Sequence, residues 1–152
     1  MAENVFTLYF AYQNMVAQEI GIERANVIGT KMCESMGASI GKMIKEQAGI
    51  EKIDAKTAYS LIKPFIQGLG INSEVIEESP QRVVSKGGRC PAFEAAQMMG
   101  LDPQTIETLV CRQGSIKLMD AMVKQLNPDL SMQISKFRSS ADDFCEEEIV
   151  LG

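Results

Sequence analysis

The chain contains no histidine and no tryptophan, and aromatic residues make up 6% of its 152 residues. Without imidazole, the most frequent general base and the most common neutral metal ligand are both missing. Polar chemistry is therefore left to thiols, carboxylates, lysines and backbone amides. Most of the functional signal then falls on four cysteines, which lack the paired CxxC spacing of common zinc modules.

Two further absences concern location and partners. No stretch approaches the roughly 20 apolar residues of a membrane span, and the first residues, MAENVFTLYF, lack the basic segment and apolar run of a secretory signal. We therefore expect a cytoplasmic protein without a membrane partner, whose cysteines stay reduced. The net charge of −5 and the scattered basic residues argue against nucleic acid as a partner.

Length and composition predict one domain spanning residues 1–152, because 152 residues with 45% hydrophobic content can bury one ordinary core. Ten methionines suggest a soft interior that remodels around an apolar guest, in a methionine-lined pocket between helices and sheet. The alternative is that the methionines simply fill the core.

The first half of the chain is predicted to be helical. Apolar residues recur at helical spacing from Asn4 to about Glu19, and a second helix is expected from about Ile22 to Ala48. Asp54 can cap a third helix that reaches roughly to Gln67, where Pro64 would bend or shorten it.

Small residues recur every four positions along the second predicted helix. They are Ala25, Gly29, Cys33, Gly37 and Gly41. Each helical glycine costs on the order of 1 kcal/mol relative to alanine, so the stripe requires a compensating close contact. Internal helix packing is the preferred interpretation, and a homodimer contact or a ligand groove is the alternative.

The second half is predicted to mix strands and helices. Two strands should flank a turn at residues 77–80, a short helix should cover residues 91–99, and another helix should extend from residue 102 to residue 126 with a break near Gly114. Alternating residues from Leu130 and again from Phe144 predict a terminal hairpin with one buried face. The fold class is therefore α+β, with the middle and carboxyl-terminal antiparallel hairpins forming one small sheet.

Cys90 stands out among the cysteines because it directly precedes Pro91, a residue suited to the first position of a helix. As the cap of that helix, its sulfur would lie near unpaired amides and the positive end of the helix dipole, and Arg89 would add a positive charge. All three effects lower a thiol pKa. Cys90 is therefore the predicted reactive thiolate and the candidate catalytic nucleophile.

The remaining candidate groups pair a thiol with a carboxylate. Glu107 precedes Cys111 by one helical turn, so the two side chains would share a face and could exchange a proton or share a metal. Cys145 and Glu147 alternate onto the same face of the last strand. Glu107 is the candidate catalytic acid or base, with Glu147 as a second possibility. The simpler alternative is that these are buried thiols beside solvated carboxylates.

Three thiolates and one carboxylate or water would satisfy the four-coordinate preference of zinc. We therefore consider a zinc site with Cys90, Cys111 and Cys145 as ligands. The fold would have to assemble it from distant segments, whereas Cys33 is interpreted as a small buried residue.

An ordered series of short segments along nearly the whole chain resembles the L-2-amino-thiazoline-4-carboxylic acid hydrolase-like family. The segments are GIERA from Gly21, RCP from Arg89, EAA from Glu94, GLD from Gly100, Cys111, NPDL from Asn127 and FCE from Phe144. The named activity of that family implies hydrolytic opening of a cyclic C=N-containing ring.

The same order of elements also resembles the vinyl-4-reductase domain, a small-molecule-binding module of sensors, some of which hold zinc through cysteines and a glutamate. That resemblance matches Cys90, Cys111 and Cys145 to the cysteine positions and Glu107 loosely to the glutamate. The interval between Cys111 and Cys145 is longer here than in those sensors.

Two functions therefore compete. One is hydrolysis of a small C=N or amide-type substrate, with Cys90 as nucleophile or zinc ligand and Glu107 as proton carrier. The missing part is an obvious general base, since the chain has no histidine. The other is a non-catalytic module that binds or senses a small molecule, in which the cysteines form a structural or redox site.

Overall fold

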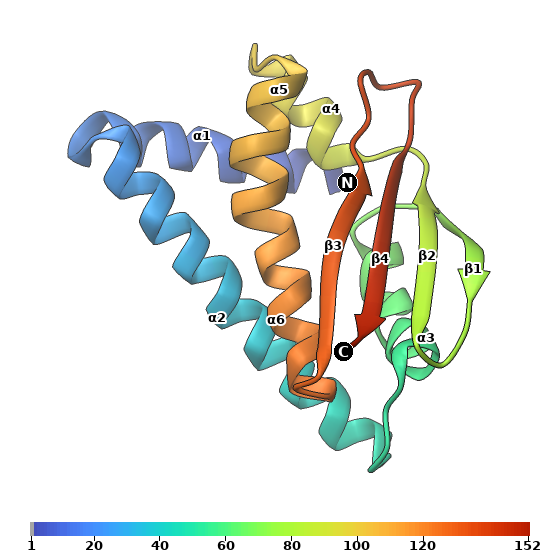
Figure 1. The fold of residues 1–152 in the computed structure, drawn as a ribbon. Coiled ribbons are helices and arrows are strands. Elements are labelled where there is room, and N and C mark those ends of the chain that lie inside the picture. Colours follow the sequence, from blue (N-terminus) through green and yellow to red (C-terminus); the bar gives the residue numbers. More distant parts are fainter. Residues whose placement is uncertain (1) are drawn as a thin grey trace.

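The computed structural model describes residues 2–152, with side chains from residue 4 onward. The elements form a mixed α+β fold, as predicted (Figure 1). The first three are helices: α1 (Ala2–Ile20), α2 (Ile22–Ala48) and α3 (Ala55–Gly68). The rest are β1 (Ser73–Glu78), β2 (Arg82–Gly87), α4 (Pro91–Met98), α5 (Pro103–Thr105), η1 (Ile106–Ser115), α6 (Ile116–Leu126), β3 (Leu130–Lys136) and β4 (Cys145–Leu151).

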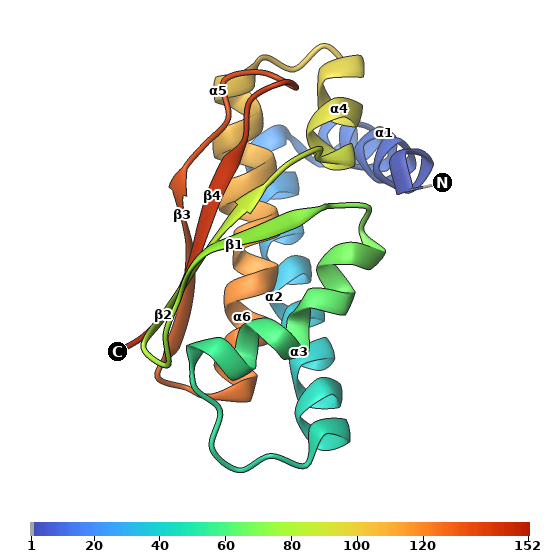
Figure 2. The ribbon, with the colours of Figure 1, turned by 90° about the vertical axis from the view of Figure 1, so that its right-hand side faces the viewer.

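The two predicted hairpins combine into one antiparallel sheet with strand order β1-β2-β4-β3. In register, Val83 of β2 and Met132 of β3 flank Ile149 of β4, and all three side chains are buried. Their shared face lies against α3 and α6 (Figure 2). The alternation of β3 therefore works as its sequence predicts, with apolar residues facing the helices.

The glycine stripe of α2 packs inside the molecule. A Cβ atom on Gly37 or Gly41 would overlap the carbonyl oxygen of Leu118 or Met122 in α6. Glycine is therefore required at these two positions for the backbones to approach. This confirms internal packing and leaves no room at these glycines for a second subunit or a ligand.

The helix from residue 102 to residue 126 does not break at Gly114 as expected. Its middle part, η1, is instead a π-helix, whose backbone bonds join residues five apart. The Thr30 hydroxyl of α2 donates a 2.8 Å hydrogen bond to the carbonyl oxygen of Gln113, which ties this wide turn to its neighbour. Pro64 also leaves its helix unbroken, since α3 continues to Gly68.

Buried apolar side chains gather in two clusters. The larger one joins α2, α3, α6 and the sheet, and includes Ile62, Met122 and Ile149. The smaller one joins α1, α4 and η1 through Phe10, Phe93 and Ile106. Cys90 and Cys111 pack against the smaller cluster.

Among the helices in the described part of the chain, none combines the length and apolar character that a membrane crossing requires.

Candidate functional site

The fold brings the three candidate cysteines into one neighbourhood. Cys90 caps α4, Cys111 lies in η1, and Cys145 begins β4. The charges of Cys90 and Cys145 both act on the Cys111 thiol, and Cys145 also acts on Cys90. Cys33 lies apart on the α2 stripe and is buried, which agrees with its interpretation as a packing residue.

An arginine that sequence reasoning missed lies at the centre of this neighbourhood. Arg138, from the loop between β3 and β4, is only 2% exposed. Its Nε donates to the Cys145 Sγ over 3.3 Å, and a terminal nitrogen donates to the Gly87 carbonyl over 3.1 Å. The same nitrogen also donates to the Gly88 carbonyl. We call Arg138 with Cys90, Cys111 and Cys145 the cysteine–arginine cluster.

The Arg138 guanidinium also lies over an aromatic ring, with its central carbon 5.5 Å from the centroid of Phe93 in α4. One side chain therefore ties together the start of β4, the end of β2 and α4. The sequence offers a weak signal for this role, which is a single arginine directly after Phe137 in an otherwise polar turn. Nothing in spacing or periodicity indicates that the turn folds inward.

Cys90 has the predicted position but not the predicted pKa. Burial raises the pKa of the Cys90 thiol, although the amide of Phe93 and the charge of Arg138 act in the opposite direction. The prediction of a lowered pKa was wrong because it counted the helix start and a basic neighbour but omitted desolvation. Arg89, the basic neighbour invoked, directs its guanidinium to Glu94 instead.

Cys111 is held even more firmly as a thiol. Burial is the largest cause that raises the pKa of Cys111, and the charges of Cys90, Cys145 and Glu147 add to it. Glu147 faces the same neighbourhood from β4, and burial raises the pKa of its carboxyl while Arg138 opposes that shift.

Glu107 does not join this group. Its carboxylate accepts a 2.8 Å hydrogen bond from the Arg112 Nε, five residues later along η1. The predicted neighbour relation between Glu107 and Cys111 assumed the spacing of an α-helix. A π-helix brings residues five apart into line, so the arginine becomes the partner of the glutamate. Its proposed proton transfer in catalysis remains a prediction from sequence alone.

The cysteine–arginine cluster does not fit a zinc ion as it is arranged. Within the described residues, no three cysteine, aspartate or glutamate side chains are grouped so that they could hold a metal. The positive charge within the cluster comes from the Arg138 guanidinium, which already donates a hydrogen bond to the Cys145 sulfur. The zinc site predicted from the cysteine pattern therefore gains no support from the geometry.

A groove of ligand size lies elsewhere, between α2 and α3. Its volume is about 410 Å³. The lining residues are Ile40, Ile44, Gln47, Ala48, Leu61, Pro64 and Phe65. Six of these seven are apolar, and Gln47 brings the one polar side chain, so the groove suits an uncharged apolar guest. The expected methionine lining is wrong, because the guest-sized groove contains no methionine and does not border the sheet.

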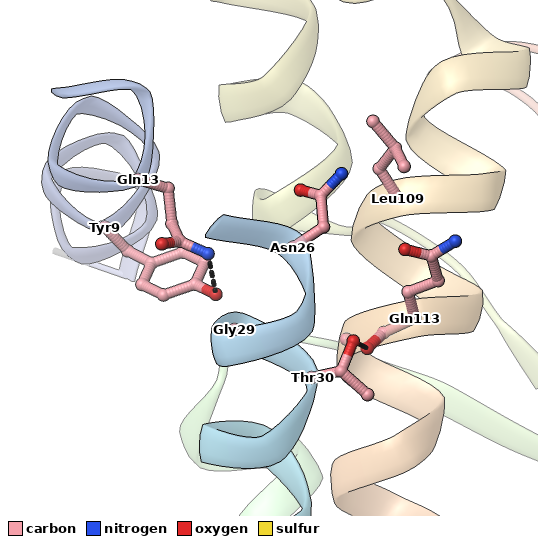
Figure 3. Close-up of a pocket in the computed structure, with 8 residues that line it drawn as sticks. Tyr9, Gln13, Asn26, Gly29, Thr30, Leu109 and Gln113 are labelled. Carbon is pink, nitrogen blue, oxygen red and sulfur yellow. Dashed lines mark hydrogen bonds between the residues drawn. The ribbon is translucent and has the colours of Figure 1, made fainter. Parts of the chain in front are cut away.

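A second, polar pocket lies where α1, α2 and η1 meet (Figure 3). Tyr9 and Gln13 project into it from α1, with a 3.3 Å hydrogen bond from the Gln13 amide to the Tyr9 hydroxyl. Gln113 reaches it from η1. Its volume of about 30 Å³ matches the space of a single water molecule, so it is too small for an organic ligand.

Comparison with known proteins shows similarity of fold. No family model and no curated protein matches the chain, so the resemblance to the hydrolase-like family gains no support. Trafficking protein particle complex subunit 3 from Naegleria fowleri, solved covalently bound to palmitic acid, superposes with a TM-score of 0.67 at 17% identity. This match covers 99% of this chain and 95% of that chain.

The phenol-responsive sensory domain of the transcription activator PoxR, solved with phenol, superposes with a TM-score of 0.65 at 11% identity. Here 96% of this chain and 74% of that chain are covered. At these identities the likeness concerns the fold alone. The chain thus shares its fold with both of these solved structures.

Proposed function

We propose that this protein is a non-catalytic module that binds a small apolar molecule in the groove between α2 and α3. The observation that carries the proposal is the groove itself, with about 410 Å³ and no charged side chain in its lining. Ligand pockets commonly have volumes of roughly 300 to 1,000 Å³ and predominantly apolar walls.

The chemistry of the lining defines the class of ligand. Ile44 of α2 and Leu61 and Phe65 of α3 offer aliphatic and aromatic contacts, and Gln47 offers one amide for a single polar group. The lining offers no counter-ion, so the carboxylate of a fatty acid would lie in solvent at the open side of the groove. We therefore expect a hydrocarbon chain or a single aromatic ring with at most one polar end, which would lie toward Gln47.

The two structural neighbours support this class of ligand. One is described with phenol, an aromatic ring with one hydroxyl, and the other with palmitic acid, an acyl chain with one polar end. Both combine a hydrocarbon body with a single polar group, which is what the groove of this chain would accept.

The competing hydrolase function has no comparable support. A thiol nucleophile acts as the thiolate, and burial raises the pKa of both Cys90 and Cys111. The carboxylate of Glu107 is engaged with Arg112. Hydrolysis at the cysteines thus stays a prediction from sequence, and we assign the cysteine–arginine cluster a structural role.

The proposal is tested by titrating the protein with phenol and with palmitic acid and measuring binding by calorimetry. We expect saturable binding of at least one of them. Replacement of Ala48 by Phe places a ring in the groove and should weaken that binding at least tenfold, which is about 1.4 kcal/mol.

The matched control is Ser39→Phe, which adds the same ring to an exposed position of α2 outside the groove lining. It should leave the affinity unchanged while both variants keep the melting temperature of the parent protein. Failure of both ligands to bind, or equal binding by the Ala48→Phe variant, would overturn the proposal.

A further inference from the structure

Helix α1 carries an apolar stripe that faces solvent. The exposed fractions are 64% for Val5, 72% for Leu8, 65% for Tyr12 and 66% for Met15. The helix is otherwise held in place by its opposite side, where Phe10 is buried and its ring lies 5.5 Å from that of Tyr9. A surface helix normally presents polar residues to water. Because α1 is apolar on both sides, the exposed stripe is a candidate contact surface.

We propose that this stripe is the contact between two copies of the chain, with the two α1 helices packed antiparallel across a twofold axis. The stripe has the spacing three, four, three, which reads the same in both directions. An antiparallel copy therefore sets Val5 against Met15 and Leu8 against Tyr12, apolar against apolar at every position. Such self-complementarity is the requirement for a twofold interface.

Charge is compatible with the same arrangement. Residues 4–18 contain no Asp, Glu, Lys or Arg, so two antiparallel helices bring no like charges together along the stripe. Glu19 lies near the carboxyl-terminal end of α1 and would approach the amino-terminal end of the other α1. That end carries the positive pole of the helix dipole, which favours a carboxylate, whereas the negative charge of Glu3 at the same end opposes this effect.

The exposed area is adequate for the apolar centre of such an interface. The four side chains are 64% to 72% exposed and form one apolar patch on a helix face, and apolar patches of about 300 to 600 Å² on single chains are often functional. One partner in a standard interface contributes about 800 Å², about half of it apolar. The uncharged polar residues that flank the stripe on α1 would supply the rim.

This contact is distinct from the glycine stripe, on which a dimer was considered from the sequence. Gly37 and Gly41 are covered by α6, whereas the residues proposed here are on α1 and point away from the core. It also differs from the ligand groove, whose lining contains no residue of α1. Dimerisation and ligand binding can therefore fail independently.

The test is the oligomeric state in solution, measured by sedimentation equilibrium with the full chain. We expect a mass close to twice 16.7 kDa at micromolar concentration. Leu8→Glu and Tyr12→Lys, each tested alone, should both shift the protein to monomer, because each sets two charges against apolar residues. Met98→Glu, at an 80% exposed position of α4, is the matched control and should remain dimeric.

Mixing the two charge variants tests the antiparallel register. In a mixed dimer, the glutamate at position 8 of one copy meets the lysine at position 12 of the other, and the second contact keeps its Leu8 and Tyr12. Native mass spectrometry should therefore show heterodimers in excess of either homodimer. A monomeric parent protein, dissociation by Met98→Glu, or failure of the mixed variants to associate would overturn the proposal.

Discussion

A single residue, Arg138, changes the interpretation of the three cysteines. Their placement at the start of α4, within η1 and at the start of β4 follows from local sequence signals, such as Pro91 after Cys90. The pKa values of their thiols cannot be predicted from local sequence, because a thiol pKa depends on how deeply the fold buries the sulfur. An inward-facing turn residue such as Arg138 has no periodic signal, so its role could not be predicted.

The Arg138 guanidinium occupies the place that a metal ion would take beside the Cys145 sulfur. If the guanidinium provides the positive charge of the cysteine–arginine cluster, zinc in protein purified without chelator should be far below one per chain. Addition of a chelator should leave the melting temperature unchanged. Elemental analysis and thermal unfolding check these two outcomes. Stoichiometric zinc together with destabilisation by chelator would show instead that the thiols hold a metal.

The stability of Arg138 variants provides the complementary measurement. Arg138→Met removes donors from the Gly87 and Gly88 carbonyls and from Cys145, and should lower the free energy of unfolding by about 2 to 5 kcal/mol. Arg89→Met is the control, since that side chain is 59% exposed and its ion pair with Glu94 contributes about 1 kcal/mol or less.

Glu147 gives a prediction with a defined pH dependence. Burial raises the pKa of the Glu147 carboxyl in the folded state above its value in the unfolded chain. At pH values between these two pKa values, the folded chain therefore binds more protons than the unfolded chain. Stability is therefore lost as the pH rises through this window. Glu147→Gln should stabilise the protein at pH 7, and the gain should vanish below about pH 4. Denaturant unfolding at both pH values checks this, and a destabilised variant at pH 7 would contradict it.

At the scale of elements, periodicity and end signals locate most of the fold. Asp54 accepts a 2.7 Å hydrogen bond from the Thr57 amide and caps α3 as predicted. The alternation in β3 and β4 correctly indicates a terminal hairpin. The π-helical segment at residues 106–115 was missed because the prediction assumed α-helical spacing there.

The glycine stripe of α2 yields the prediction at this scale. Alanine is the better helix former by about 1 kcal/mol, yet Gly37→Ala should destabilise the protein by about 1 to 3 kcal/mol because its Cβ would overlap the Leu118 carbonyl. Gly68→Ala has open space around it and should be neutral or slightly stabilising. Equal effects of the two substitutions on denaturant unfolding would contradict the close packing of α2 on α6.

At the scale of the whole molecule, the two candidate sites lie in different parts of the fold. The cysteine–arginine cluster adjoins the smaller apolar cluster, while the apolar groove between α2 and α3 borders the larger one. Composition indicated a binding module with an apolar guest, but the groove could not be placed. Its walls include Ile44 and Phe65, which have the residue types of an ordinary core. These side chains remain partly exposed because of the way α2 and α3 pack in three dimensions, which the sequence pattern does not indicate.

The location of the bound ligand tests the central claim most directly. A fatty acid with a photoactivatable diazirine on its chain would be bound to the unmodified protein, irradiated, and its attachment sites identified by peptide mass spectrometry. The account predicts labels on α2 between Ile40 and Ala48 and on α3 between Leu61 and Phe65, with competition by unlabelled palmitic acid. Competed labels concentrated on α4, η1 or the start of β4 would contradict it and return the function to the cysteines.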